Sequence, residues 1–262
     1  MKAQTSALAI LCFVLTSLST SLQATIVEFK TSLGDFEVNL FDEITPETVE
    51  NFLQYVQQES YHHNVVHRSI PGFIIQGGGF VYDDELPADK LPLSLVSANA
   101  PVTNEPELSN RRGTIAMAKL EYNPNSATNQ WFFNLDNNSV HLDGQNGGFT
   151  VFGQVSAQGL EVIDAIAALP RYNLDNGVLS DVPLRNYTSA DAAAGVEITE
   201  DNWVFIESVV VVDARTDTAS GLNPVANEAE PEIPWGDAPS SGSIGWSLLA
   251  LLLCVGLRRL RR

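Results

Sequence analysis

Cysteine is almost absent from this sequence. The chain of 262 residues has two, Cys12 and Cys254, and each lies in a hydrophobic segment close to a terminus. The body between them can therefore hold no internal disulfide and no thiol catalyst. A body without cysteine also suits an oxidising compartment.

Basic residues are also scarce. Lys and Arg together number 14 against 32 Asp and Glu, a net charge of −18. Five of the basic residues lie in the terminal segments (Lys2, Arg258, Arg259, Arg261 and Arg262), which leaves nine against 32 and a net charge of −23 in the body. Such a surface repels phosphate backbones, so we expect no nucleic-acid partner. The acidity favours solubility in a salty or extracytoplasmic setting.

Long hydrophobic runs are confined to the two ends of the chain. Residues 1–24 begin with Lys2, continue through an apolar stretch at 7–18, and end in small and polar residues up to Ala24. This order is typical of a secretory signal peptide, with cleavage near Ala24, and the stretch is too short and too interrupted by Ser and Thr to span a membrane. We therefore expect an exported protein that reaches the periplasm, the cell surface or the medium.

The other run lies at the C-terminus, where residues 242–262 form a Leu-rich tail that ends in an Arg cluster. About 14 apolar residues make roughly 21 Å of helix, against about 30 Å of hydrocarbon in a bilayer. The tail resembles the sorting tails that an intramembrane protease removes from some exported bacterial proteins. The alternative is a membrane anchor, which would hold the protein at the membrane with the arginines on the cytoplasmic side.

Between the ends, the hydrophobic pattern predicts mainly strands, with two helices. A helix begins at Thr45 and Pro46, because Thr is a good N-cap and Pro fits the first helical turn. A second helix follows from the apolar spacing at 160–169 and ends at Pro170. The predicted strands lie at 26–30, 36–40, 66–70, 73–80, 113–118, 130–135, 151–155 and 203–213. The segments 82–110 and 171–202 show no period and are expected to be loops, and 214–241 has the composition of a flexible linker.

One stretch, VHRSIPGFIIQGGGF at 66–80, carries two polar side chains inside apolar strand patterns. Pro71 and Gly72 predict a turn between two short strands. Arg68 and Gln76 would be costly to bury without partners. They must either hydrogen-bond inside a core or line a cleft, and the stretch alone does not decide between the two.

Three blocks in this order resemble the cyclophilin family of peptidyl-prolyl cis–trans isomerases. They are HRSIPGFIIQGGGF, GTIAMA with NSATNQWFFNL, and HLDGQNGGFTVFG, and the resemblance extends over 25–213. It implies a mainly β fold, a cyclophilin-like eight-stranded antiparallel barrel capped by two α-helices. It also implies an isomerase that accelerates rotation about Xaa-Pro bonds during folding of exported proteins.

The resemblance assigns roles to individual residues. Arg68 matches the catalytic arginine, and Gln76 matches the glutamine beside it. The pocket for the proline ring is implied at Phe73, Ile74, Phe132 and Leu142, the edge that holds substrate backbone at Ala118 and Lys119, and a polar groove residue at Gln130. Two positions depart from the family pattern: His141 stands where Trp or Phe is frequent, and Phe149 stands where His or Tyr is frequent. Both departures are expected to affect substrate or drug binding.

The same resemblance implies no cofactor, a monomer, and proline-containing polypeptides as partners, with a cyclosporin-type ligand left open. His62, His63 and His67 have a spacing that invites a metal site, but no carboxylate or cysteine set accompanies them, so we expect none. A non-catalytic module that binds proline peptides or acts as a chaperone at the cell surface is the alternative function.

Overall fold

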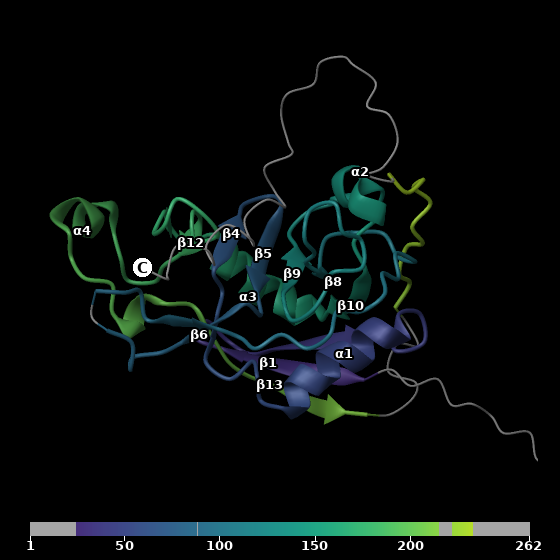
Figure 1. The fold of residues 1–262 in the computed structure, drawn as a ribbon, viewed down its shortest axis with the longest axis horizontal. Helices are drawn as coiled ribbons and strands as arrows, with labels where there is room; N and C mark the ends of the chain where they lie inside the picture. The colour runs from purple at the N-terminus through teal and green to yellow at the C-terminus, as the bar shows by residue number, and fades with distance from the viewer. Residues whose placement is uncertain (1–24, 88, 215–221, 233–262) are drawn as a thin grey trace, which may run out of the picture.

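The computed structural model describes residues 25–87, 89–214 and 222–232, and most of them form one curled antiparallel sheet (Figure 1). Its strand order is β4-β5-β9-β8-β10-β2-β1-β13-β3-β6-β7. The strands are β1 (Ile26–Thr31), β2 (Phe36–Leu40), β3 (Asn64–Val65), β4 (Arg68–Ile70), β5 (Ile74–Gly77), β6 (Phe80–Tyr82), β7 (Leu93–Leu95), β8 (Thr114–Met117), β9 (Trp131–Asn134), β10 (Val151–Val155) and β13 (Phe205–Asp213).

A single bent segment closes this sheet into a barrel. β3 pairs with β13 and β4 pairs with β5, and only Val66 and His67 separate β3 from β4. The Val66 amide donates to the Val204 carbonyl at 3.0 Å and the His67 amide donates to the Gln76 carbonyl at 3.1 Å, so both ladders continue through the bend. The curled antiparallel sheet confirms the predicted mainly β fold, but it has 11 strands where eight were predicted, because short strands such as β3, β4, β6 and β7 are separate elements. β6 continues β5, and β7 adds a short hairpin partner to β6.

Alternation along the strands separates an inner core from an outer apolar cluster. Phe29, Ile75 and Phe133 belong to the inner core, whereas Ile74 and Phe132 belong to the outer cluster. Successive side chains of a strand point to opposite faces, so neighbours in sequence contribute to different clusters. The outer cluster is the part of the fold that forms the site described below.

The two predicted helices are α1 (Pro46–Gln57) and α3 (Ala157–Ala167). Thr45 precedes α1 as expected, but its side chain makes no capping hydrogen bond. The carboxylate of Glu105 caps this helix instead, accepting from the amides of Glu47 at 3.2 Å and Thr48 at 2.8 Å. The predicted positions of Thr45 and Pro46 are therefore confirmed, but the capping hydrogen bonds come from a residue distant in sequence. Ser156 caps α3 by accepting from the Gly159 amide.

The segment 171–202, expected to be a loop, forms a small lobe beside the barrel. It contains β11 (Arg171–Tyr172), which pairs with β12 (Val182–Pro183), together with α4 (Ser189–Ala194) and the 3₁₀ turn η2 (Glu200–Asn202). An apolar cluster that includes Leu179, Tyr187 and Trp203 joins the lobe to β3 and β6. Figure 1 shows this lobe at the end of the molecule marked by α4 and β12.

Residues 222–232 lie inside the predicted linker 214–241 and run along the opposite end of the molecule, beside α2 (Ser139–Leu142) and the 3₁₀ turn η1 (Gln145–Gly147) (Figure 1). The predicted signal peptide and C-terminal tail lie outside the described residues. Among the residues that the structure describes, no helix is long and apolar enough to cross a membrane.

Candidate active site

The register of neighbouring strands lines up the central residues of the predicted site. Arg68 in β4 stands opposite Gln76 in β5, and Gln76 stands opposite Phe132 in β9. Side chains at directly opposite positions project to the same face of an antiparallel sheet. Ile74 lies two residues from Gln76 and shares that face. The strand pattern therefore brings a cation, an amide and an apolar surface together on the outside of the barrel.

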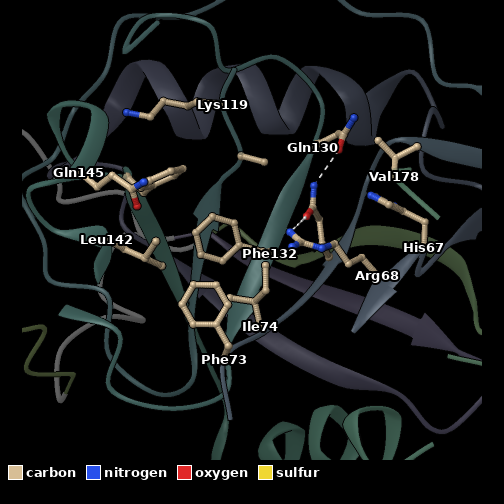
Figure 2. Close-up of a pocket in the computed structure, with 13 residues that line it drawn as sticks. His67, Arg68, Phe73, Ile74, Lys119, Gln130, Phe132, Leu142, Gln145 and Val178 are labelled. Atoms are coloured by element: carbon tan, nitrogen blue, oxygen red, sulfur yellow. Dashed lines mark hydrogen bonds between the residues drawn. The ribbon is translucent and has the colours of Figure 1, made fainter. Parts of the chain in front are cut away.

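These side chains line a pocket (Figure 2), in which Arg68, His67 and Gln130 lie together on one side and Phe73, Ile74, Phe132 and Leu142 lie toward the other. Ten of the eleven residues implied by the sequence resemblance line it: Arg68, Gln76, Phe73, Ile74, Ala118, Lys119, Gln130, Phe132, Leu142 and Phe149. His67, Gln145 and Val178 complete the lining.

On the polar side, a chain of amides leads to Arg68. Gln76 donates from Nε2 to Gln130 Oε1 at 2.9 Å, and its own Oε1 accepts from Arg68 Nη1 at 3.5 Å. The second contact is long for a hydrogen bond and therefore weak, and it uses only one of the five N–H donors of the guanidinium. Burial lowers the pKa of Arg68, and the negative charge of Asp181 acts in the opposite direction. Among the residues that the structure describes, the Arg68 side chain hydrogen-bonds only to Gln76, which leaves its other N–H donors available at the pocket.

On the apolar side, four side chains form a wall that contains few polar atoms. Ile74 and Leu142 are each 4% exposed, and Phe132 is 3% exposed. The ring of Phe149 packs against the ring of Phe132 with centroids 5.8 Å apart and planes at 72°, the edge-to-face geometry that aromatic pairs prefer. The wall therefore offers a buried apolar surface to a small apolar group.

His141 is the one expected residue that does not line the pocket. It is exposed on α2, and its ring lies edge-on to that of Phe73 at 6.5 Å between centroids. The helix places His141 on the exposed side and Leu142 in the pocket lining. The residue at 141, which differs from the family pattern, therefore lies at the outer edge of the pocket. Phe149, the other departure, lies within the wall itself.

Lys119 has a different contact pattern from the one the resemblance implies. Its Nζ donates to Asn104 Oδ1 at 3.1 Å, to the Asn146 carbonyl at 2.9 Å and to the Gly148 carbonyl. The ammonium also lies 4.9 Å from the Phe149 ring centroid, which places it over the face of that ring. Burial lowers the pKa of Lys119 to about 7. These hydrogen bonds attach Lys119 to the loop 143–148, which connects Leu142 to Phe149 and is called the pocket loop below.

The backbone of this loop explains its run Asn-Gly-Gly. Asn146, Gly147 and Gly148 have φ of 51°, 77° and 77°, a left-handed conformation that favours glycine. A Cβ on Gly148 would lie 2.5 Å from the Asp143 carbonyl oxygen, so no larger residue fits there. The turn returns the chain from Leu142 to Phe149, whose amide donates to the Leu142 carbonyl at 2.9 Å.

Three residues that line the pocket were not predicted as site residues from the sequence. His67 lies in the bend that closes the barrel, and burial, helped by the charge of Arg68, lowers its pKa to about 3, so its ring is neutral near pH 7. Gln145 belongs to the third motif block, where its position next to Leu142 was the available signal. Val178 comes from the lobe, and no pattern in 171–202 could have placed it here.

The histidines considered for a metal are dispersed by the fold. His62 and His63 stack on each other at 5.2 Å, and His63 lies 3.3 Å from the carboxylate of Glu207. His67 is buried against Phe80. Within the described part of the chain, no three His, Cys, Asp or Glu residues are grouped so as to hold a metal ion.

Comparison with known proteins gives a consistent family. Residues 26–189 match the family model described as "Cyclophilin type peptidyl-prolyl cis-trans isomerase/CLD". A peptidyl-prolyl cis-trans isomerase of Acinetobacter baylyi is 40% identical over 151 residues, covering 57% of this chain and 76% of the relative. Peptidyl-prolyl cis-trans isomerase B of Escherichia coli is 38% identical over 161 residues, covering 60% of this chain and 92% of the relative.

Among solved structures, a cyclophilin type peptidyl-prolyl cis-trans isomerase of Cryptosporidium parvum superposes with a TM-score of 0.48 and 21% identity. This superposition covers 72% of the chain and 98% of that structure. The family match ends at residue 189, so β13 and the segment 222–232 lie beyond it.

Proposed function

The chain belongs to the cyclophilin-type peptidyl-prolyl cis–trans isomerases, and we propose that Arg68 is its electrostatic catalyst while the apolar wall holds the proline ring. One observation carries this assignment: Arg68 lies at the edge of an apolar pocket, oriented by Gln76, with free donors on its guanidinium. Both parts that the reaction needs, a grip on the ring and a donor beside it, are within one pocket.

The chemistry explains why these parts suffice. Rotation about a peptide bond meets a barrier of about 18–20 kcal/mol because resonance gives the C–N bond partial double-bond character. No covalent bond breaks during the rotation, so the reaction requires no nucleophile. In the twisted state the prolyl nitrogen regains its lone pair and can accept a hydrogen bond. Arg68 donates to that nitrogen only when the amide is twisted, which stabilises the transition state more than the ground state.

The required magnitude is modest. A 10⁴-fold acceleration corresponds to about 5.4 kcal/mol. A charge-assisted hydrogen bond is worth about 1.5–3 kcal/mol, and more where water is excluded. Immobilising the ring against Phe132 and Leu142 while the carbonyl side rotates contributes the rest. Arginine suits the role because its planar fork stays charged and keeps other donors for the substrate carbonyl.

We propose further that the substrates are exported proteins. The signal-peptide pattern of residues 1–24 and the cysteine-free body support this assignment. The C-terminal tail would then be removed by an intramembrane protease after export. Intact-mass measurement on the exported protein tests both parts: loss of the N-terminal 24 residues and of the Arg cluster is expected, and retention of Met1 and Arg262 would contradict them.

A non-catalytic module that binds proline peptides is the competing function. A protease-coupled or NMR exchange assay with a short Xaa-Pro peptide separates the two. Wild type is expected to accelerate isomerisation, Arg68→Ala to lose about 100-fold or more of kcat/KM, and Arg68→Lys to recover part of that loss as a point charge.

Arg171→Ala serves as the matched control, because Arg171 is exposed on β11 and does not line the pocket. It should retain wild-type activity. If wild type binds the peptide yet isomerises it no faster than Arg68→Ala, the catalytic assignment is wrong and the binding module is the better description.

A further inference from the structure

The segment Leu222–Glu232, which we call the C-terminal strap, makes backbone contacts with the catalytic domain. The Ser109 amide donates to the Val225 carbonyl at 2.8 Å, and the Asn227 amide donates to the Glu107 carbonyl at 2.9 Å. Leu108 and Ala226 form the β-bridge between these bonds. The strap thus adds a short antiparallel strand to the segment 107–109.

Side-chain and backbone groups of the strap also reach the pocket loop. Asn227 donates from Nδ2 to the Asp143 carbonyl at 2.9 Å, and the Glu232 amide donates to the Gly144 carbonyl at 2.9 Å. These two acceptors lie between Leu142 and Gln145, which both line the pocket. The strap is therefore hydrogen-bonded to Asp143 and Gly144, the two residues that connect Leu142 to Gln145 in the pocket lining.

The segment 107–109 leads to the same wall by a second route. Asn110 donates from Nδ2 to the Phe149 carbonyl at 3.1 Å and to the Asp143 carboxylate at 3.0 Å. Ser109 Oγ donates to the same carboxylate. Both of the strap's attachments, at 107–109 and at 143–144, thus end on the loop between Leu142 and Phe149.

We propose that the C-terminal strap contributes to the proline site by fixing the position of the pocket loop, and that Asn227 is a positioning residue for the wall residues Leu142 and Phe149. This inference rests on the proposed function of the pocket. The pocket loop contains three residues with positive φ, at 146–148, and such a backbone needs contacts with other segments to keep its conformation. Lys119 and Asn104 hold its far end at residues 146–148, whereas Asn227 and Glu232 hold its near end.

The main test compares two substitutions in the full chain. Asn227→Asp removes the donor to the Asp143 carbonyl and places a carboxylate beside it. Asn223→Asp makes the same chemical change four residues earlier, at an exposed side chain that hydrogen-bonds to no described residue. For Asn227→Asp we expect KM for an Xaa-Pro peptide to rise about two- to tenfold, the effect of one lost hydrogen bond, with kcat within about twofold.

A purely structural role predicts a different pattern, in which the unfolding midpoint falls and KM stays constant. Asn223→Asp should leave KM and the midpoint unchanged. An unchanged KM in a folded Asn227→Asp protein overturns the inference while the proposed function stands. A wild type that does not isomerise the peptide overturns the proposed function itself.

A second measurement needs no variant. Saturating wild type with the same peptide should slow hydrogen exchange at the amides of Asn227 and Glu232, because both are bonded to segments that the occupied wall immobilises. Unchanged exchange at both amides would show that the strap does not respond to the pocket, and the inference would fail.

Discussion

Phe132 and Phe133 are adjacent in β9 and serve opposite sides of the barrel wall. Phe133 lies in the inner core, with its ring 5.5 Å from that of Phe29 and 5.3 Å from that of Trp131. Phe132 lies in the outer cluster against Phe149. The two are nearly equally buried, at 3% and 1% exposed, so burial alone does not distinguish a pocket residue from a core residue.

Truncating these two rings should therefore separate binding from stability. Phe133→Ala leaves a cavity in a close-packed core and should cost about 3–5 kcal/mol of unfolding free energy. Phe132→Ala should cost less stability but reduce kcat/KM roughly 10- to 100-fold, because about 1.5–3 kcal/mol of contact with the proline ring is lost. Chemical denaturation and the isomerase assay on both variants check this. Equal stability losses with equal activity would contradict the assignment of the two faces.

Gln76 offers a test of how Arg68 is oriented. Gln76→Ala removes the acceptor at 3.5 Å from Nη1 and should lower kcat/KM about fivefold, which corresponds to roughly 1 kcal/mol for one weak hydrogen bond. Gln130→Ala removes only the amide that accepts a hydrogen bond from Gln76, and should lower kcat/KM less. If Gln130→Ala is the more damaging change, the groove rather than the orientation of Arg68 limits activity.

The predicted site residues share one pocket where alternation and motif blocks acted together. The period of two placed Arg68 and Gln76 on one face of a hairpin, and the aligned blocks supplied Phe132, Leu142 and Phe149 from other strands and loops. Ten of the eleven predicted residues line the pocket. Only His141 does not, because a helix of four residues places it and Leu142 on different sides.

What could not be predicted depends on contacts between segments far apart in the chain. Val178 reaches the pocket from a lobe whose sequence has no period. Glu105 takes the capping role expected of Thr45, since propensity alone cannot identify a carboxylate 57 residues away from the Thr48 amide. The docking of the strap depends likewise on paired backbone groups, and its composition of Pro, Asn and Glu resembles that of any flexible linker.

The cap on α1 is itself testable. Glu105→Ala removes the acceptor of two helix amides and of the Thr48 hydroxyl, and should lower the unfolding free energy by about 0.5–2 kcal/mol. Glu105→Gln keeps one acceptor oxygen and should lose less. Glu107→Ala is the matched control, because Glu107 is exposed in the same loop and caps no helix. Denaturation curves of the three variants decide the matter, and equal losses in Glu105→Ala and Glu107→Ala would contradict the capping role.

The buried ammonium of Lys119 predicts a dependence of stability on pH. Its pKa is about 7 in the folded protein and 10.5 as an ordinary lysine, because burial disfavours the charged form, although the three oxygen acceptors around Nζ act in the opposite direction. Between these two values the unfolded chain holds a proton that the folded protein has released. Unfolding free energy must then rise with pH across that window.

Lys119→Met has no such proton and provides the reference. Relative to it, wild type should gain up to about 1.4 kcal/mol of stability per pH unit between pH 7 and pH 10, and show no change in the difference below pH 6. Denaturation of both proteins at pH 5, 6, 8 and 9 measures these slopes. Parallel slopes would mean that the three acceptors restore an ordinary pKa, and that Lys119 holds the pocket loop as a permanent cation throughout this range.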